Sequence, residues 1–223
     1  MLPEISIRSH SSDQFVLDKV LYSNSYRINQ LISNSVIVDI GAHIGAFSIN
    51  CALRHASKIY AFEPLQDNYS ILTRNLGNFS QNFRAFQLGI NSEAGFLKVE
   101  EPKLVSNAFY ESSEIGISDS GTDCYFIKLD EAIRSISEKI YLMKVSAKGR
   151  EYELLNACTN LFAVKNLCFE MECSKDEAEG IEQSIKRKGS FNDSIVRKVT
   201  DKHYLFNFSQ EDCNICFNKY NTT

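Results

Sequence analysis

A strand pattern, two glycines and a carboxylate stand together near the start of the chain. The run VIVDI at 36–40 is β-branched and ends in Asp39-Ile40, and Gly41 and Gly45 follow it before a small, apolar helical stretch at 45–55. Glycines at such a turn let the backbone approach a ligand closely and let the helix pack on the strand, while the first helical turn offers free N–H donors. The spacing predicts a ligand-binding loop after this strand.

A second carboxylate, Glu63, ends the next predicted strand at 58–62 and is followed by Pro64. A carboxylate in this place can accept hydrogen bonds from two ribose hydroxyls. Asp39 would repel a pyrophosphate but suits a cation, and the G-x-x-x-G spacing differs from the G-x-G-x-x-G of dinucleotide-binding proteins. We therefore expect S-adenosylmethionine as the cofactor and disfavour an NAD-dependent oxidoreductase.

Alternating strand and helix patterns must position these residues. Further strands are expected at 83–88, 140–145 and 167–171, and further helices at 67–77, capped by Asp67, and at 150–157 and 175–188. Two more strands, 95–100 and 124–129, read as an inserted β-hairpin with a polar, flexible loop at 112–121, and 203–208 and 213–217 as an antiparallel pair. We predict an α/β fold with a Rossmann-like, doubly wound and mostly parallel sheet, whose ligand lies at the carboxyl ends of the strands.

The domain organisation is expected to be simple. Residues 1–33 carry apolar residues at helical spacing and predict an N-terminal helical cap, and 34–223 predict the Rossmann-like domain, within a single domain overall. The net charge of −4 argues against nucleic acid as a partner, and neither a signal peptide nor a membrane span is recognisable, so we expect a cytoplasmic protein that does not bind membranes.

The seven cysteines are expected to be reduced, buried thiols. Cys213 and Cys216 have the C-x-x-C form, but in a strand their sulfurs would point to opposite faces, so no metal site is predicted.

The sequence also carries a family resemblance. The segments VIVDIGAHIGAFSIN, IYAFEPLQDNYSILTRNL, AFQLGINSEAGFLKV, IKLDEAI and LMKVSAKGREYELL resemble the FkbM-type family in order and spacing, from about residue 36 to residue 172. That family comprises class I methyltransferases that depend on S-adenosylmethionine and commonly methylate hydroxyl groups of natural products or sugars. The resemblance implies cofactor contacts at Asp39, Gly41, Ala42, His43, Gly45, Glu63, Pro64, Leu88, Gly89 and Ser146.

The chain departs from the family pattern at the end of the fourth strand. Where the family has K-I-D-V-E-G-x-E, this chain has K-V-S-A-K-G-R-E at 144–151, so Ser146 and Lys148 replace two carboxylates. Hydroxyl and ammonium groups are poor magnesium ligands, and metal-independent chemistry is expected. Candidates for the group that receives the acceptor's proton are His43, Lys148, Glu170 and Glu172.

Two functions follow from these patterns. The first is S-adenosylmethionine-dependent O-methylation of a small molecule or glycan, such as a sugar or secondary-metabolite hydroxyl. The second is a cofactor-binding protein that has lost transferase activity and serves as a regulatory or partner subunit. Ser146 and Lys148 are the residues that separate the two.

Overall fold

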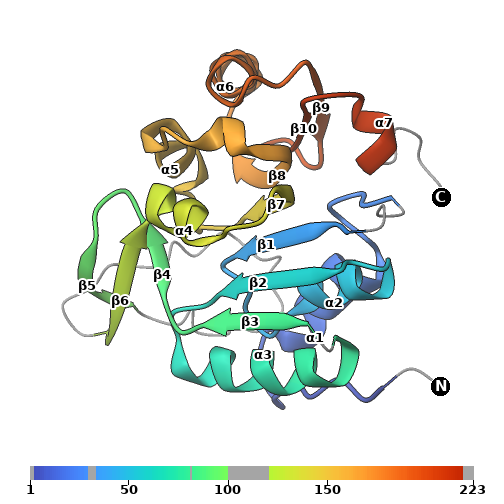
Figure 1. Cartoon of the computed structure of the whole chain (residues 1–223), viewed down its shortest axis with the longest axis vertical. Coiled ribbons are helices and arrows are strands. Elements are labelled where there is room, and N and C mark those ends of the chain that lie inside the picture. Colours follow the sequence, from blue (N-terminus) through green and yellow to red (C-terminus); the bar gives the residue numbers. More distant parts are fainter. Residues whose placement is uncertain (1–2, 30–33, 81, 100–120, 218–223) are drawn as a thin grey trace.

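The computed structural model describes residues 3–29, 34–80, 82–99 and 121–217. Its main sheet has seven strands in the order β3-β2-β1-β7-β8-β10-β9 (Figure 1). These strands are β1 Val36–Ile40, β2 Lys58–Phe62, β3 Phe83–Phe86, β7 Ile140–Val145, β8 Val164–Glu172, β9 Asp193–Lys198 and β10 His203–Ser209. The five strands from β3 to β8 are parallel, and β10 and β9 are antiparallel additions. The mostly parallel α/β sheet and its antiparallel C-terminal pair are confirmed.

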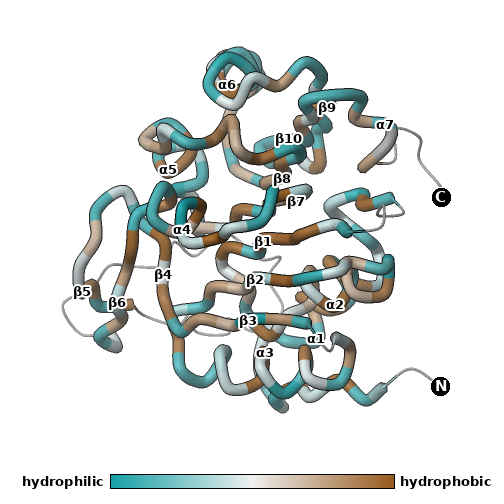
Figure 2. The backbone as a smooth tube through the Cα atoms, in the orientation of Figure 1, coloured by the Kyte–Doolittle hydropathy of each residue, from teal (hydrophilic) through white to brown (hydrophobic). Residues whose placement is uncertain are grey.

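Hydrophobic burial explains why the central strands lie where they do. Every residue of β1 and of β7 is buried, and β1 is among the most hydrophobic segments of the backbone (Figure 2). Strands that are covered on both faces are mostly apolar, and β1 and β7 are apolar except for Asp39 and Lys144. The sheet interior therefore comes directly from the β-branched pattern of the sequence.

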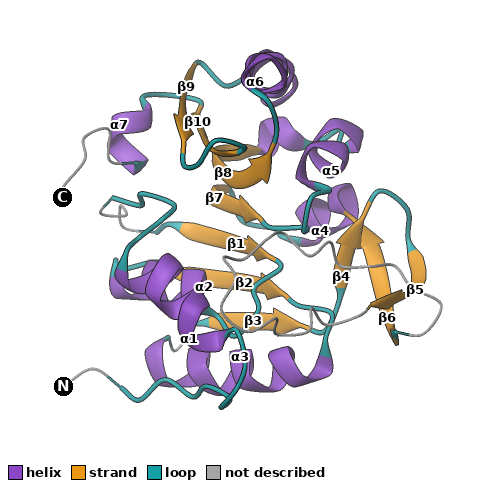
Figure 3. Cartoon of the chain, turned by 180° about the vertical axis from the view of Figure 1, so that it is seen from behind, coloured by secondary structure: helices purple, strands orange, loops and turns teal. Residues whose placement is uncertain are grey.

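Helices cover both faces of this sheet (Figure 3). One face carries α1 Asp13–Val16, the π-helical turn η1 Leu17–Tyr22, α2 Ala46–Leu53, α3 Gln66–Phe79 and α7 Cys213–Cys216, and the other carries α4 Leu129–Ser135, α5 Glu151–Ala157, the short η2 Leu161–Ala163 and α6 Lys175–Gly189. Each layer has its own core of buried aliphatic and aromatic side chains. Among the described residues, no helix combines the length and apolar character needed to cross a membrane.

A smaller sheet lies on the side to which the arrowheads of β1, β2 and β3 point (Figure 1). Its strands are β4 Gly89–Asn91, β5 Gly95–Val99 and β6 Thr122–Lys128, in the order β4-β6-β5. The antiparallel pairing of β5 with β6 confirms the inserted hairpin, and β4 adds a parallel third strand. Most of the polar loop predicted at 112–121 lies outside the described residues.

Two local predictions are wrong, and one helix was not predicted. Residues 213–217 do not form a strand: the Asp212 carboxylate accepts the Asn214 N–H and caps the short helix α7, and Asp193–Lys198 takes the place beside β10. Helix α3 begins at Gln66 without a side-chain cap from Asp67 and continues past Gly77. Helix α4, which follows β6 directly, was not expected from the pattern.

The N-terminal segment is helical over Asp13–Tyr22. Leu17, Leu21 and Ile28 are buried against the α2 layer, while the apolar residues at 31 and 32 lie outside the described residues. The division into a cap at 1–33 and a domain at 34–223 stays a prediction.

Candidate functional site

Strand register brings four predicted site residues to one level at the carboxyl edge of the sheet. The residues in register across β2, β1, β7 and β8 are Phe62, Ile40, Val145 and Phe169. The next residues in these strands are Glu63, Gly41, Ser146 and Glu170. Adjacent strands are roughly 4.8 Å apart, so Glu63 and Glu170 stand about 14 Å apart at either end of this row. The row therefore has a carboxylate residue on each side of the glycine loop.

The glycine loop is fixed to the neighbouring strands. The N–H groups of Gly41 and Ala42 both donate to the Phe62 carbonyl at 3.0 Å. Gly41 has φ +68°, and a Cβ on it would lie 2.1 Å from the Ser146 carbonyl oxygen. Gly45 has φ +94°, and its Cβ would meet Leu72 of α3 at 3.0 Å. The close approach that these glycines permit is thus to the protein's own strand and helix.

Asp39 is fully buried and already carries partners. Its carboxylate accepts the Ser48 hydroxyl at 2.7 Å and the Lys144 ammonium at 3.0 Å. Lys144 also donates to the carbonyls of Ile40 and Gly41, at 3.1 and 2.8 Å. This internal ion pair holds the glycine loop against β7, and the direct contact between Asp39 and a cofactor stays a prediction.

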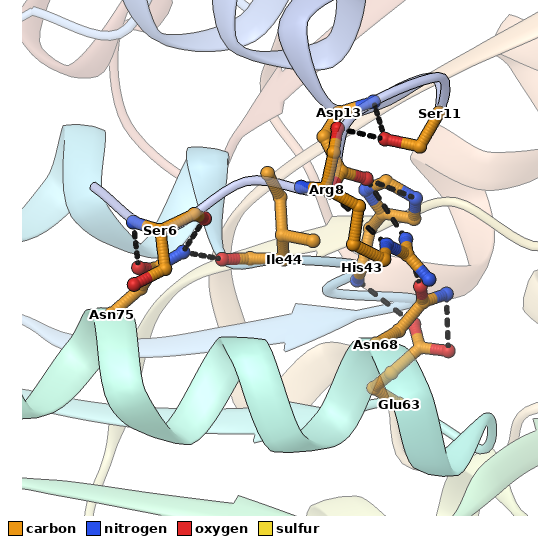
Figure 4. Close-up of polar contacts among 9 residues, drawn as sticks. All are labelled: Ser6, Arg8, Ser11, Asp13, His43, Ile44, Glu63, Asn68 and Asn75. Carbon is orange, nitrogen blue, oxygen red and sulfur yellow. Dashed lines mark hydrogen bonds and ion pairs between the residues drawn. The ribbon is translucent and has the colours of Figure 1, made fainter.

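Glu63 is buried just before the N-terminus of α3, and its carboxylate binds the backbone of the glycine loop. It accepts the N–H groups of His43 at 2.8 Å and Leu65 at 3.1 Å, together with the Asn68 amide at 3.2 Å (Figure 4). Burial raises the pKa of Glu63 above its ordinary value, against the lowering effect of these hydrogen bonds. The carboxylate is held in a fixed orientation, and the neighbouring Pro64 is bonded through its carbonyl to the thiol of Cys124.

Leu88 and Gly89 follow β3, and Gly89 is the first residue of β4 in the small sheet. Leu88 packs against the core on the α4 and α5 side. A Cβ on Gly89 would lie 2.1 Å from the Phe126 ring, so the glycine makes room for that ring. Their expected contact with the cofactor stays a prediction.

An N-terminal cluster that the sequence did not predict covers Glu63 and His43. The Arg8 guanidinium binds both the Asp13 carboxylate, at 2.8 Å, and the Asn68 amide oxygen, at 2.6 Å. Figure 4 shows that Arg8, Asp13, His43, Asn68 and Glu63 form a closed ring of polar neighbours. Arg8 and Asn68 are 60 residues apart in sequence, and no local pattern links them.

His43 occupies a strained position in the loop. It has φ 53°, its Nε2 lies 3.8 Å from Asp13 Oδ1, and its buried Nδ1 has no hydrogen-bond partner among the described residues. Burial lowers the pKa of His43 to about 4, so the imidazole is neutral at pH 7.

The loop between β7 and α5 holds Ser146 and Lys148, the two residues that differ from the FkbM-type pattern. The Ser146 N–H donates to the Ile40 carbonyl at 3.1 Å, which places it beside the glycine loop. The buried Glu151 accepts the N–H groups of Ala147 and Gly149, and so fixes the backbone on both sides of Lys148. Lys148 has φ 52°, and its charge is close enough to lower the pKa of His43.

Glu170 lies at the same edge but in a separate cluster. Its side chain is 7% exposed and is paired with the Lys19 ammonium of η1, and His203 Nε2 lies 3.6 Å from it. Glu172, the other acid considered on β8, is half exposed and lies 3.9 Å from His203 Nδ1. The structure therefore groups His43, Lys148 and Glu63 on one side of the edge and Glu170 on the other.

Cysteines and metal ligands add no further site in the described part of the chain. All seven cysteines are free, and Cys213 and Cys216 are buried as expected, although they lie in the helix α7 and not in a strand. Among the described residues, no three His, Cys, Asp or Glu side chains are grouped so that they could hold a metal ion.

Comparisons with known proteins agree with this architecture. Methyltransferase sdnD of Sordaria araneosa is 30% identical over 174 residues, which cover 64% of this chain and 67% of that protein. Hexuronic acid methyltransferase AglP of Haloferax volcanii is 24% identical over 181 residues, 80% of this chain and 72% of that protein. The solved structure of precorrin-6y C5,15-methyltransferase from Geobacter metallireducens superposes with a TM-score of 0.53 at 12% identity, over 92% of this chain and 93% of that one.

The fold and the glycine loop thus place this molecule among the Rossmann-like α/β proteins, and the superposition shows the same fold in a methyltransferase. The chain belongs to the methyltransferase family that includes sdnD. No family model matches it.

Proposed function

We propose that this chain is an S-adenosylmethionine-dependent methyltransferase of the FkbM type that methylates a hydroxyl group of a sugar, a glycan or a secondary metabolite. The observation that carries the proposal is Glu63. It is a buried carboxylate at the carboxyl end of β2, held by the His43 backbone N–H of the glycine loop. A carboxylate so placed can accept the two ribose hydroxyls of a nucleoside cofactor.

The charges at this edge suit a sulfonium cofactor. With its ribose on Glu63, the cofactor would extend along the row from Glu63 past Gly41 to Ser146. The methionine portion would then lie over the β1 and β7 ends, near the carboxylate of Asp39, which is paired with Lys144, and the carboxylate of Asp13 beside His43, which is paired with Arg8. A cofactor with two phosphates would have to approach these same carboxylates, which disfavours it.

Methyl transfer to a hydroxyl requires orientation and the removal of one proton. The acceptor oxygen forms a bond to the methyl carbon as the carbon–sulfur bond breaks, and the sulfonium becomes a neutral thioether. The protein must hold the oxygen in line with that bond and provide a group that takes the hydroxyl proton. The hexuronic acid acceptor in AglP's name supports a sugar among the candidate acceptors.

The test is transfer of labelled methyl groups from S-adenosylmethionine to a panel of glucose, galactose, mannose, rhamnose, glucuronic acid and hydroxylated aromatic metabolites. We expect label in at least one hydroxyl of the panel and saturable binding of S-adenosylhomocysteine by calorimetry. Binding without transfer would favour the regulatory or partner subunit. The absence of both would overturn the proposal.

A further inference from the structure

Glu170 lies on the cofactor-facing edge but takes no part in the cluster around Glu63. It is one residue beyond Phe169, which is in register with Val145, so Glu170 stands level with Ser146 and Gly41. Side chains alternate along a strand, and Cys168 belongs to the core on the α2 face, so Glu170 points to that same face. Its position is therefore beside the place where the methionine portion of the proposed cofactor would end.

The carboxylate of Glu170 is only half satisfied. Its Oε2 is bonded to Lys19 and faces His203 Nε2, whereas its buried Oε1 has no hydrogen-bond partner among the described residues. A buried carboxylate oxygen without a donor is unfavourable, and in folded proteins such an atom is usually paired with a protein group, an ordered water or a bound ligand. Lys19 and His203 are 35% and 26% exposed, so the cluster borders solvent on their side.

We propose that Glu170 Oε1 binds the methyl acceptor by accepting a hydrogen bond from the hydroxyl group that is methylated. This inference rests on the function proposed above and adds the acceptor side of the same site. A carboxylate oxygen selects a hydrogen-bond donor and repels an anion, so the reacting group is a neutral hydroxyl and not a carboxylate. Glu170 is then a catalytic residue, and Lys19 and His203 are positioning residues that fix its other oxygen.

The proton balance of transfer follows from this contact. As the hydroxyl oxygen attacks the methyl carbon, it becomes positively charged and its proton passes to Glu170, which ends as a neutral acid beside a methyl ether and a thioether. Burial alone would raise the pKa of Glu170, but His203 and Lys19 together hold it below its ordinary value. Glu170 is therefore ionised at neutral pH, and it can still accept a proton from an oxygen that has already gained the methyl group.

The N-terminal helix contributes directly to this arrangement. Lys19 comes from η1, a six-residue π-helical turn, and π-helical turns occur often at functional sites. The segment packs on α2, the helix that follows the glycine loop. The N-terminal helix thus packs on the helix that follows the glycine loop and, through Lys19, also contacts Glu170.

The test compares Glu170→Gln with Glu211→Gln. Glu211 pairs with Lys165 at the opposite end of β8 and β10, so its variant removes a similar acid from the same pair of strands. With the panel sugar that the wild type methylates fastest, we expect Glu170→Gln to lower kcat/KM at least 100-fold while the Kd of S-adenosylhomocysteine changes less than twofold. Glu211→Gln should match the wild type in both measurements.

Lys19 provides a second test that does not depend on the folding of the Glu170 variant. Lys19→Met should raise the KM for that sugar at least tenfold with little change in cofactor affinity, and Lys19→Arg should restore it. A Glu170→Gln enzyme within threefold of wild type would overturn the inference and leave the proposed function standing. A wild type that binds S-adenosylhomocysteine but methylates only carboxylates would overturn both the inference and the proposed hydroxyl acceptor. Loss of cofactor binding in the wild type itself would instead overturn the proposed function.

Discussion

The Lys144 ammonium lies 3.0 Å from Asp39 Oδ1, and both side chains are almost completely buried. Removing one member of such a pair leaves an uncompensated charge in the core. We expect Lys144→Met to lower the free energy of unfolding by about 3–5 kcal/mol, measured by urea denaturation. The double variant Lys144→Met, Asp39→Asn should recover part of this loss. Equal losses in the single and double variants would contradict the pairing.

Lys198→Met is the matched control for that experiment. Lys198 is paired with Asp201 on the surface, where both side chains are exposed, so its removal should leave the urea midpoint unchanged.

Gly41→Ala should destabilise the protein more than Gly149→Ala. Both glycines have positive φ, and alanine at either position carries backbone strain of roughly 1–3 kcal/mol. Only at Gly41 would the new methyl group also collide with the Ser146 carbonyl, because nothing lies within 4 Å of a Cβ on Gly149. Thermal or urea unfolding of the two variants measures the difference. Equal destabilisation would contradict this expectation, because it would mean that the Ser146 carbonyl moves away from the new methyl group at no cost in free energy.

Acid should weaken the folded state through His43. Its pKa is about 4 when folded against an ordinary value of 6.5, so the unfolded chain binds the proton first. Stability from this group is complete above pH 6.5 and is lost as the pH falls from 6.5 towards 4, by up to roughly 3 kcal/mol. We expect His43→Asn, which tolerates the positive φ, to lose less stability than wild type between pH 7 and pH 5 in urea titrations. An identical pH dependence in both would remove His43 as the cause.

Transfer activity should not depend on a divalent metal. Ser146 and Lys148 are poor ligands for magnesium, and the nearby buried Glu151 is occupied by two backbone N–H groups. Labelled methyl transfer should therefore be the same with and without EDTA. Activity that disappears with chelator and returns with magnesium would contradict this expectation.

How far the sequence could predict the site depends on the range of the contacts. Asp39, Gly41 and Glu63 could be placed because buried parallel strands produce unbroken apolar runs, and their ends must meet at one edge. The partner of Asp39 and Gly41 could not be placed, since Lys144 reaches both across more than 100 residues with no local signature. Arg8, which binds Asn68 beside Glu63, is likewise distant in sequence.

Short elements were harder to predict than long ones. The segment from Cys213 to Cys216 was predicted as part of a strand. It forms one helical turn instead, which the Asp212 side chain caps by accepting the Asn214 N–H. The sequence also could not show why glycine is needed at position 41. It predicted a close approach to a ligand, whereas in the structure the space beside Gly41 is filled by the Ser146 carbonyl.

The most direct test of the central claim is calorimetric binding of S-adenosylhomocysteine to the wild type, to Glu63→Gln and to Glu138→Gln. Glu138 bonds Lys58 and Tyr60 near the opposite end of β2, which makes it a carboxylate control away from the proposed site. We predict that the wild type and Glu138→Gln bind with equal affinity, and that Glu63→Gln binds about 10- to 100-fold more weakly, as expected for loss of a charged hydrogen-bond acceptor. Unchanged affinity in a folded Glu63→Gln protein would contradict the assignment of the ribose to Glu63.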